Sequence, residues 1–503
     1  MRDRSERRIL INDDGWIIGE EPPVNVPDLQ EKVVGTYEGT PVGVLLWSVG
    51  GHETYEFETD VGVRFGEGYD HFDNPRHAHM KRNLRSLIDE CGGPVTAFVN
   101  LCHDAGIEFF PSIRMNQHYE MDQSAPSYHF RRDHPELLIG RPDEDIPDGT
   151  IDSGIRTGLN FAFPEVRAHL SSIAIELVER WDVDGIELDW LRHPGYFRTE
   201  EAYGNRYLVT DLVRKVRRRM DEVGDERGRR IELAVRVPAT KFNAERIGLD
   251  VASWIRERLV DIVIVGGGFV PFETRVDEFV AAAEGTDCQV YGCIERLGGI
   301  EGDEMVRAIA ARYFHLGASG IYLFNYFPQP VEWKRKVLNE IADPASLSRL
   351  NKRYKIDNFP ICGTRETSQI GWAFRNAIPL TQLPVALEQT VAGSAVLLQL
   401  TIADDIDLAL TDNAIDSCTL LLGIDNYTPE DTLEMRLNAE RIEWESRIEK
   451  TDAEVPTFEF NISAAILRHG ENELTIRLDA GGRGGMESVL LTKVEIAIEY
   501  FSA

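Results

Sequence analysis

Short apolar runs alternate with helix-period stretches from the N-terminus to about residue 345. Segment 163–181 is typical of the helical stretches, with a proline near its start and apolar residues at helical spacing. Segments 201–224 and 303–317 follow the same pattern. Eight apolar runs have the length and composition of buried strands. They are residues 9–12, 42–48, 107–115, 185–190, 231–237, 260–266, 288–295 and 320–327.

Eight strands that alternate with helices predict a (β/α)₈ TIM barrel, an α/β fold that typically takes about 250 residues without insertions. The alternative is a doubly wound open sheet, but no G-x-G-x-x-G motif follows the first strand. Glycines 266–268 come after the sixth strand, and we expect them to form a tight turn. The sequence therefore predicts a barrel over residues 1–345.

After about residue 358 the pattern changes to short runs with alternating faces, separated by turn residues and without long helical stretches. This pattern is typical of an all-β sandwich. We predict a linker over 346–360 and a jelly-roll-like sandwich over 361–503. The segments "MRLNAERIEW" and "GENELTIRL" within it resemble the lectin-like jelly-roll domains that accompany many glycoside hydrolases, although such sandwiches also serve as structural or dimerisation modules.

The composition limits the partners. The formal net charge is −31, and such an acidic surface repels nucleic acid and anionic lipid. Neither a signal peptide nor an 18-residue apolar stretch is visible, so we expect a cytoplasmic protein without membrane contact. The six cysteines lack metal-ligand spacing and are expected to be reduced. We expect no cofactor and no metal, and the sequence leaves open whether the chain forms a homo-oligomer.

Two carboxylates interrupt the fourth predicted strand. Glu187 and Asp189 are two residues apart, so their side chains share one face, separated by about 6.6 Å at the rise of about 3.3 Å per residue. Ile186, Leu188 and Trp190 occupy the other face, as expected for packing against helices. Both carboxylates should therefore point into the barrel, with Asp189 nearer the C-terminal mouth, where TIM-barrel enzymes place their chemistry.

Other strand ends supply polar and aromatic groups. On the seventh strand Tyr291, Cys293 and Glu295 share a face, and Glu295 is the one nearest the mouth. Each candidate also has a structural interpretation: Glu187 could orient an arginine, Asp13 and Asp14 could form a turn, and the aromatic residues could lie in the core. The predicted substrate-binding residues are Asp13, Asp14, Trp47, Arg114, Asn116, His118, Arg192, His193, Arg236, Asn325 and Tyr326.

The segment "DGIELDWLRHP" resembles the fourth-strand motif of the glycosyl-hydrolase-like (family-10-like) TIM barrels, within the broad α-galactosidase-type group. The motif covers about eleven residues, and the order of strands extends the resemblance over the barrel. In that group the aspartate that ends the fourth strand is the usual catalytic carboxylate, which implies this role for Asp189. The chain differs in having Glu187 where His is frequent and Trp190 where a second Asp is frequent.

We therefore predict a glycoside hydrolase that acts on a carbohydrate substrate with two carboxyl groups. Asp189 would be the nucleophile or base, Glu295 the general acid, and Glu187 a third catalytic candidate. One alternative is a metal-assisted lyase or isomerase of a sugar acid, with Asp13, Glu187, Asp189 and Glu295 as oxygen ligands. The other is a carbohydrate-binding protein that kept the barrel and lost the chemistry.

Overall fold

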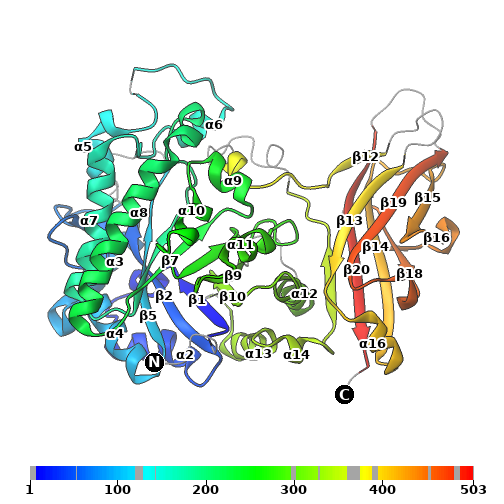
Figure 1. Cartoon of the computed structure of the whole chain (residues 1–503), viewed down its shortest axis with the longest axis horizontal. Helices are drawn as coiled ribbons and strands as arrows, with labels where there is room; N and C mark the ends of the chain where they lie inside the picture. Colours follow the sequence, from blue (N-terminus) through cyan, green and yellow to red (C-terminus); the bar gives the residue numbers. More distant parts are fainter. Residues whose placement is uncertain are drawn as a thin grey trace.

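A parallel barrel and an antiparallel β-sandwich stand side by side along the longest axis of the molecule (Figure 1). The structure is a computed structural model. It describes residues 7–51, 54–118, 129–141, 143–295, 302–326, 329–359, 374–387, 395–450, 455–480 and 488–501.

All eight predicted barrel strands form, and the pairing of the first with the second closes the parallel sheet. The predicted TIM-barrel fold is thus confirmed. Two short strands, β3 (Thr54–Tyr55) and β4 (Val63–Arg64), extend the sheet beyond β2. The barrel strands are β1 (Ile9–Asp13), β2 (Val42–Gly51), β5 (Glu108–Arg114), β6 (Gly185–Asp189), β7 (Glu232–Val237), β8 (Ile262–Val265), β9 (Gln289–Glu295) and β10 (Gly320–Phe324).

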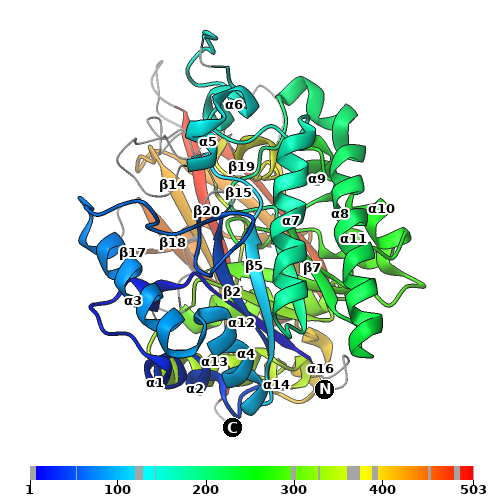
Figure 2. The same ribbon diagram turned by 90° about the vertical axis from the view of Figure 1, so that its left-hand side faces the viewer.

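Helices cover the outside of the barrel, and α7 (Pro164–Arg180) lies beside α8 (Thr199–Arg227) in Figure 2. Proline at the first position of α7 fixes a helical φ without losing a hydrogen bond, as the sequence suggested. The remaining longer helices are α3 (Pro75–Cys91), α4 (Pro94–Asp104), α11 (Val276–Ala283), α12 (Gly302–His315) and α13 (Val331–Ile341). Shorter ones are α1 (Val26–Leu29), α2 (Gly35–Tyr37), α5 (His129–Asp133), α6 (Ile151–Ile155), α9 (Lys241–Arg246), α10 (Val251–Arg256) and α14 (Pro344–Leu347).

Side-chain alternation along the strands separates two apolar layers. Ile186, Leu188 and Trp190 belong to the outer core that packs against the helices. A separate buried cluster fills the barrel interior and includes Phe110, Tyr322 and Phe324. Glu187 and Asp189 face this interior, as predicted from the two-residue period. The full interior cluster is Leu10, Val44, Leu46, Phe110, Ala234, Ile262, Ile264, Tyr291, Cys293, Tyr322 and Phe324.

A buried ion-pair network closes the N-terminal end of the barrel. The guanidinium of Arg7 donates to Glu108 at 2.7 Å and to both carboxylate oxygens of Glu232 at 2.8 and 2.9 Å. The hydroxyl of Tyr291 donates to the carbonyl oxygen of Arg7 at 2.9 Å. One cation thus joins strands β5 and β7 below the apolar interior, because buried charges need partners.

The C-terminal part forms two antiparallel sheets, which confirms the predicted sandwich. The first contains β11 (Lys352–Lys355), β20 (Val489–Tyr500), β14 (Ile415–Asp425), β18 (Thr457–Asn461) and β17 (Ile448–Lys450), with β12 (Val385–Leu387) on β20. The second contains β13 (Val396–Ile402), β19 (Gly470–Ala480), β15 (Thr432–Leu437) and β16 (Glu440–Ile442). A short helix, α16 (Ile406–Thr411), follows β13.

The stretch 346–360, expected as a linker, contains β11, which pairs with β20. The sandwich therefore begins earlier than expected, because alternating burial in a four-residue strand is a weak signal beside a helix.

The chain beyond β11 packs on the barrel. The carboxylate of Asp357 accepts hydrogen bonds from the backbone N–H groups of Phe272 and Glu273 at 2.7 and 3.1 Å. The rings of Phe359 and Phe374 both lie 5.6 Å from the ring of Phe269, which follows β8.

Two further expectations concern the described residues. The five cysteines among them are free thiols, and Cys362 lies outside them. None of the described helices combines the length and apolar character needed to cross a membrane.

We expect Arg7→Met to lower the free energy of unfolding by about 3–5 kcal/mol, because it removes the shared counterion of the buried Glu232 and the partly buried Glu108. The neighbouring exposed Arg8 is the matched control, and Arg8→Met should change stability by no more than about 0.5 kcal/mol. Urea denaturation of both variants measures the difference. Equal stabilities would mean that the network closes the barrel without stabilising it.

Candidate active site

A buried bidentate ion pair lies at the C-terminal end of the barrel interior. Arg236 donates from Nε to Oδ1 of Asp189 and from Nη2 to Oδ2, both at 2.8 Å. The sheet register aligns Asp189 with Arg236 on one side and with Arg114 on the other. Cζ of Arg236 lies 3.9 Å from the ring centroid of Phe324, so the ring face adds a cation–π contact. Strands β6, β7 and β10 thus fix this pair.

The two carboxyls of β6 have opposite electrostatics. Burial alone would raise the pKa of Asp189, but the charge and hydrogen bonds of Arg236 outweigh it and the pKa is lowered. Burial raises the pKa of Glu187 to about 7, and the charge of Asp189 adds to this rise. Asn12 donates to Oε2 of Glu187 at 3.4 Å. Asp189 is therefore the ionised member of the pair, and Glu187 is largely neutral below pH 7.

Glu295 ends β9 and is almost fully buried. Burial raises its pKa to about 7, while the charges of Arg236 and Arg192 oppose the rise. The amide of Asn325 donates to Oε1 at 3.2 Å. Gly268 has φ +75°, and a Cβ there would overlap the backbone and Cβ of Glu295. The lack of a side chain at Gly268 thus leaves room for a carboxyl that can hold a proton near neutral pH.

The rim of the site is partly open to solvent. Arg114 pairs with Asp14 at 2.5 Å, and these side chains are 17% and 20% exposed. Arg192, in the loop after β6, is also partly exposed. These three residues thus form a partly exposed rim around the buried pair of Arg236 and Asp189.

Glu56 was not predicted from the sequence. It comes from the extension of the sheet around β3, and burial raises its pKa to about 8, while the charges of Arg114 and Arg76 oppose the rise. Its carboxyl packs under Gly15, whose φ of +74° suits glycine. The segment around β3 has no periodic pattern of apolar residues, so the sequence gave no reason to single out Glu56.

Ser112, Tyr322 and Phe324 also contribute to the site without having been predicted. Ser112 pairs in register with Glu187, and the hydroxyls of Ser112 and Tyr322 oppose the rise in the pKa of Glu187. The alternation that places Glu187 inside also applies to these strands, so it could have identified all three.

Asn116, His118 and His193 are buried in the loops around the site. The amide of Asn116 donates to the carbonyl oxygens of Leu159 and Gly195 at 3.0 and 2.7 Å. Burial lowers the pKa of His118 to about 3, so its ring is neutral. The backbone N–H of His118 donates to Nδ1 of His193 at 3.3 Å. These contacts hold the loops after β5 and β6 together, and substrate binding by the three residues stays a prediction.

Trp47, Asp13 and Tyr326 do not reach the barrel interior, which corrects their predicted place at the mouth. Trp47 packs on Phe98 of α4 at 4.2 Å, because β2 runs on to Gly51 and alternation turns Trp47 outward. The ring of Tyr326 stacks on Trp333 of α13.

Asp13 is also on the outer face of its strand, and Oδ1 accepts from the backbone N–H of Gly15 at 3.0 Å. Burial raises its pKa to about 7. The side chain of Asp13 therefore stabilises the turn after β1, as its structural interpretation predicted.

Within the described residues, no group of three or more His, Cys, Asp or Glu side chains could hold a metal ion. The oxygen ligands predicted for a metal do not converge on one point. Asp13 faces the helix layer, whereas Glu187 and Asp189 face the barrel interior.

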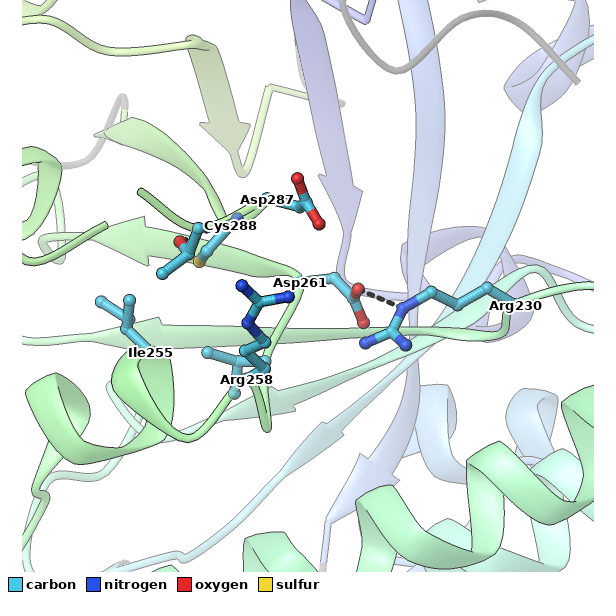
Figure 3. A pocket seen from close by; sticks show the side chains of 8 residues that line it. Arg230, Ile255, Arg258, Asp261, Asp287 and Cys288 are labelled. Carbon is cyan, nitrogen blue, oxygen red and sulfur yellow. Dashed lines mark hydrogen bonds and ion pairs between the residues drawn. The ribbon is translucent and has the colours of Figure 1, made fainter. Parts of the chain in front are cut away.

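A cavity of 160 Å³ at the opposite end of the barrel is a different feature (Figure 3). Arg230, Asp261 and Cys288 line it, and each lies just before a barrel strand. Arg230 pairs with Asp261 at 2.5 Å, and Asp261 also accepts from Arg217 and from the backbone N–H of Leu233. These charges connect the starts of the strands, on the face that supports stability in TIM barrels.

No model of a protein family matches the chain, and no curated protein is similar to it. The chain is similar to the solved structure of alpha-L-fucosidase isoenzyme 2 from Paenibacillus thiaminolyticus, with 11% identity, a TM-score of 0.42, and coverage of 67% of this chain and 48% of that one. It is also similar to a GH36 alpha-galactosidase from Geobacillus stearothermophilus, with 9% identity, a TM-score of 0.39, and coverage of 98% of this chain and 55% of that one. For chitinase ChiW from a Paenibacillus species the identity is 12% and the TM-score 0.40, with coverage of 67% of this chain and 32% of that one. The chain thus spans about half or less of these proteins, and such identities do not identify its function.

We expect Glu187→Gln to remove a pH dependence of stability. The unfolded carboxyl titrates near 4.5 and the folded one near 7, so the wild type loses stability as the pH rises through this window. Relative to wild type, the variant should gain about 3 kcal/mol between pH 4 and pH 8.

Chemical denaturation at several pH values measures this gain, with Glu226→Gln at an exposed position of α8 as the control. A constant difference between variant and wild type would show that Glu187 is ionised in the folded protein.

Proposed function

We propose that the protein is a glycoside hydrolase whose two working carboxyls are Asp189 and Glu295. One observation carries the proposal: the site keeps one carboxyl ionised and gives another a pKa of about 7. Two carboxyl groups with different protonation states are what glycosidic cleavage requires. They lie on β6 and β9, which are separated in the barrel by β7 and β8.

Glu295 is the general acid of the proposed mechanism. Because its pKa is about 7, it is largely protonated in mildly acidic solution and can donate to the leaving glycosidic oxygen. The amide of Asn325 holds one carboxyl oxygen and thereby restricts rotation of the group. The surrounding burial favours the neutral form that an acid needs.

Asp189 is the nucleophile, or the base that activates water. Its negative charge is maintained at low pH by Arg236, which also fixes the plane of the carboxylate through two parallel hydrogen bonds. The charge lies inside a low-dielectric barrel, where it would stabilise an oxocarbenium-like transition state strongly. Arg236 is in this mechanism a positioning residue.

We expect Asp189→Asn to reduce kcat by about 10²–10⁴-fold or more on any glycoside that the wild type hydrolyses. The amide fits the same space, but Arg236 loses its buried counterion, so a loss of stability should accompany the loss of activity. Activity is therefore measured per folded molecule, with folding followed by circular dichroism. Glu226→Gln, at an exposed position of α8, is the control.

Retention of near wild-type turnover by folded Asp189→Asn would contradict the assignment of Asp189.

We expect the effect of Glu295→Gln to depend on the leaving group. Hydrolysis of natural glycosides, whose leaving alcohols need a proton, should fall by about 10²–10⁴-fold, whereas activated aryl glycosides should be much less affected. The alkaline limb of the pH profile, expected near pH 7 in the wild type, should disappear in the variant.

Steady-state kinetics with a series of aryl leaving groups measures both effects. Equal losses for good and poor leaving groups would instead assign the nucleophile to Glu295.

A further inference from the structure

Arg192 lies beside the proposed general acid. It is three residues beyond Asp189, in the loop after β6. The side chain of the preceding Leu191 lies 3.2 Å from the position of a Cβ on Gly267, and the next glycine packs against Glu295. The charge of Arg192 also acts on the carboxyl of Glu295. The loops after β6 and β8 therefore meet beside Glu295, and Arg192 lies within electrostatic range of its carboxyl.

Among the residues that the structure describes, Arg114, Arg192 and Arg236 lie at the mouth, and two of these three have a carboxylate partner. Arg236 pairs with Asp189, and Arg114 pairs with Asp14. Arg192 makes no hydrogen bond or ion pair with any residue that the structure describes, and its Nε is buried without a partner. A guanidinium carries five N–H donors in a planar fork that matches carboxylate and sulfate oxygens.

The local charge balance is the reverse of that of the whole chain. Among the described residues, the mouth holds Arg114, Arg192 and Arg236 against Asp14 and Asp189, and in mildly acidic solution the neutral forms of Glu187 and Glu295 predominate. The chain as a whole has a net charge of −31. An anionic group would be repelled by most of the surface, so its binding requires a positive site of this kind.

We propose that Arg192 determines specificity by binding a negatively charged substituent, a carboxylate or a sulfate, on the sugar that lies beside Glu295. The inference rests on the proposed function, because it names the substrate class of the same site. A neutral sugar would leave the buried Nε donor and the charge of Arg192 without an anionic partner, so the site would discriminate against it.

The test compares wild type, Arg192→Lys and Arg192→Gln on matched aryl glycosides of both anomeric configurations. Each set contains a neutral hexoside, its hexuronide and its 6-sulfate. The wild type should prefer one of the anionic sugars, and Arg192→Gln should reduce the ratio of anionic to neutral kcat/KM by about 10- to 100-fold. Arg192→Lys keeps the charge without the planar fork and should be intermediate. The anionic sugar that loses most identifies the substituent.

Binding of the free hexose, hexuronate and hexose 6-sulfate is measured by calorimetry with the same three proteins. Charge-selective binding that Arg192→Gln weakens supports the inference even where no glycoside is hydrolysed, in which case the proposed function alone fails. Equal binding of neutral and anionic sugars by the wild type overturns the inference. An equal loss of turnover on all substrates, with a shift of the alkaline pH limb, also overturns it, because Arg192 then acts only through Glu295.

Discussion

The pairing of Arg236 with Asp189 is the constraint on which the upper half of the barrel depends. A guanidinium in an apolar interior must keep its counterion, so Asp189 stays ionised and fixed in place. Its negative charge then makes ionisation of the neighbouring Glu187 unfavourable. Glu295 lies within the field of Arg236, but burial has the larger effect on it. One ion pair thus helps to set the protonation states of three carboxyls on two strands.

The barrel interior separates this polar layer from the charges at its other end. The network of Arg7 occupies the N-terminal end, and the apolar cluster around Phe110 and Tyr291 fills the middle. Each charged layer therefore pairs its buried arginine with carboxylates of its own, and at the C-terminal rim Asp14 and Arg114 are partly exposed. The same architecture that stabilises the barrel leaves its C-terminal end as the place of the proposed active site.

The two-residue period of strands explains which predictions succeeded. It placed Glu187 and Asp189 inside, and the eight strands were all found because buried parallel strands are continuous apolar runs. Trp47 and Tyr326 were misplaced because position near a strand end was considered without the direction of the side chain. Glu56 lies in a stretch without a periodic pattern, so the sequence did not reveal it. The hydrogen bonds of Asn116 to the carbonyl oxygens of Leu159 and Gly195 depend on loop conformations that the sequence does not predict. The family-10-like resemblance remains a prediction.

The site is also supported by residues that the sequence analysis placed in the linker and in the sandwich. Phe359 comes from the predicted linker and Phe374 from the predicted sandwich, yet both pack on Phe269. Phe269 follows Gly268, the residue that packs against Glu295. The carbonyl oxygen of Asn376 accepts from Asn243 of α9, which fixes the same segment to a second barrel loop. The loops beside Glu295 are therefore supported by Phe359, Phe374 and Asn376, which lie between β11 and β12 in the chain and fix this connection to the barrel.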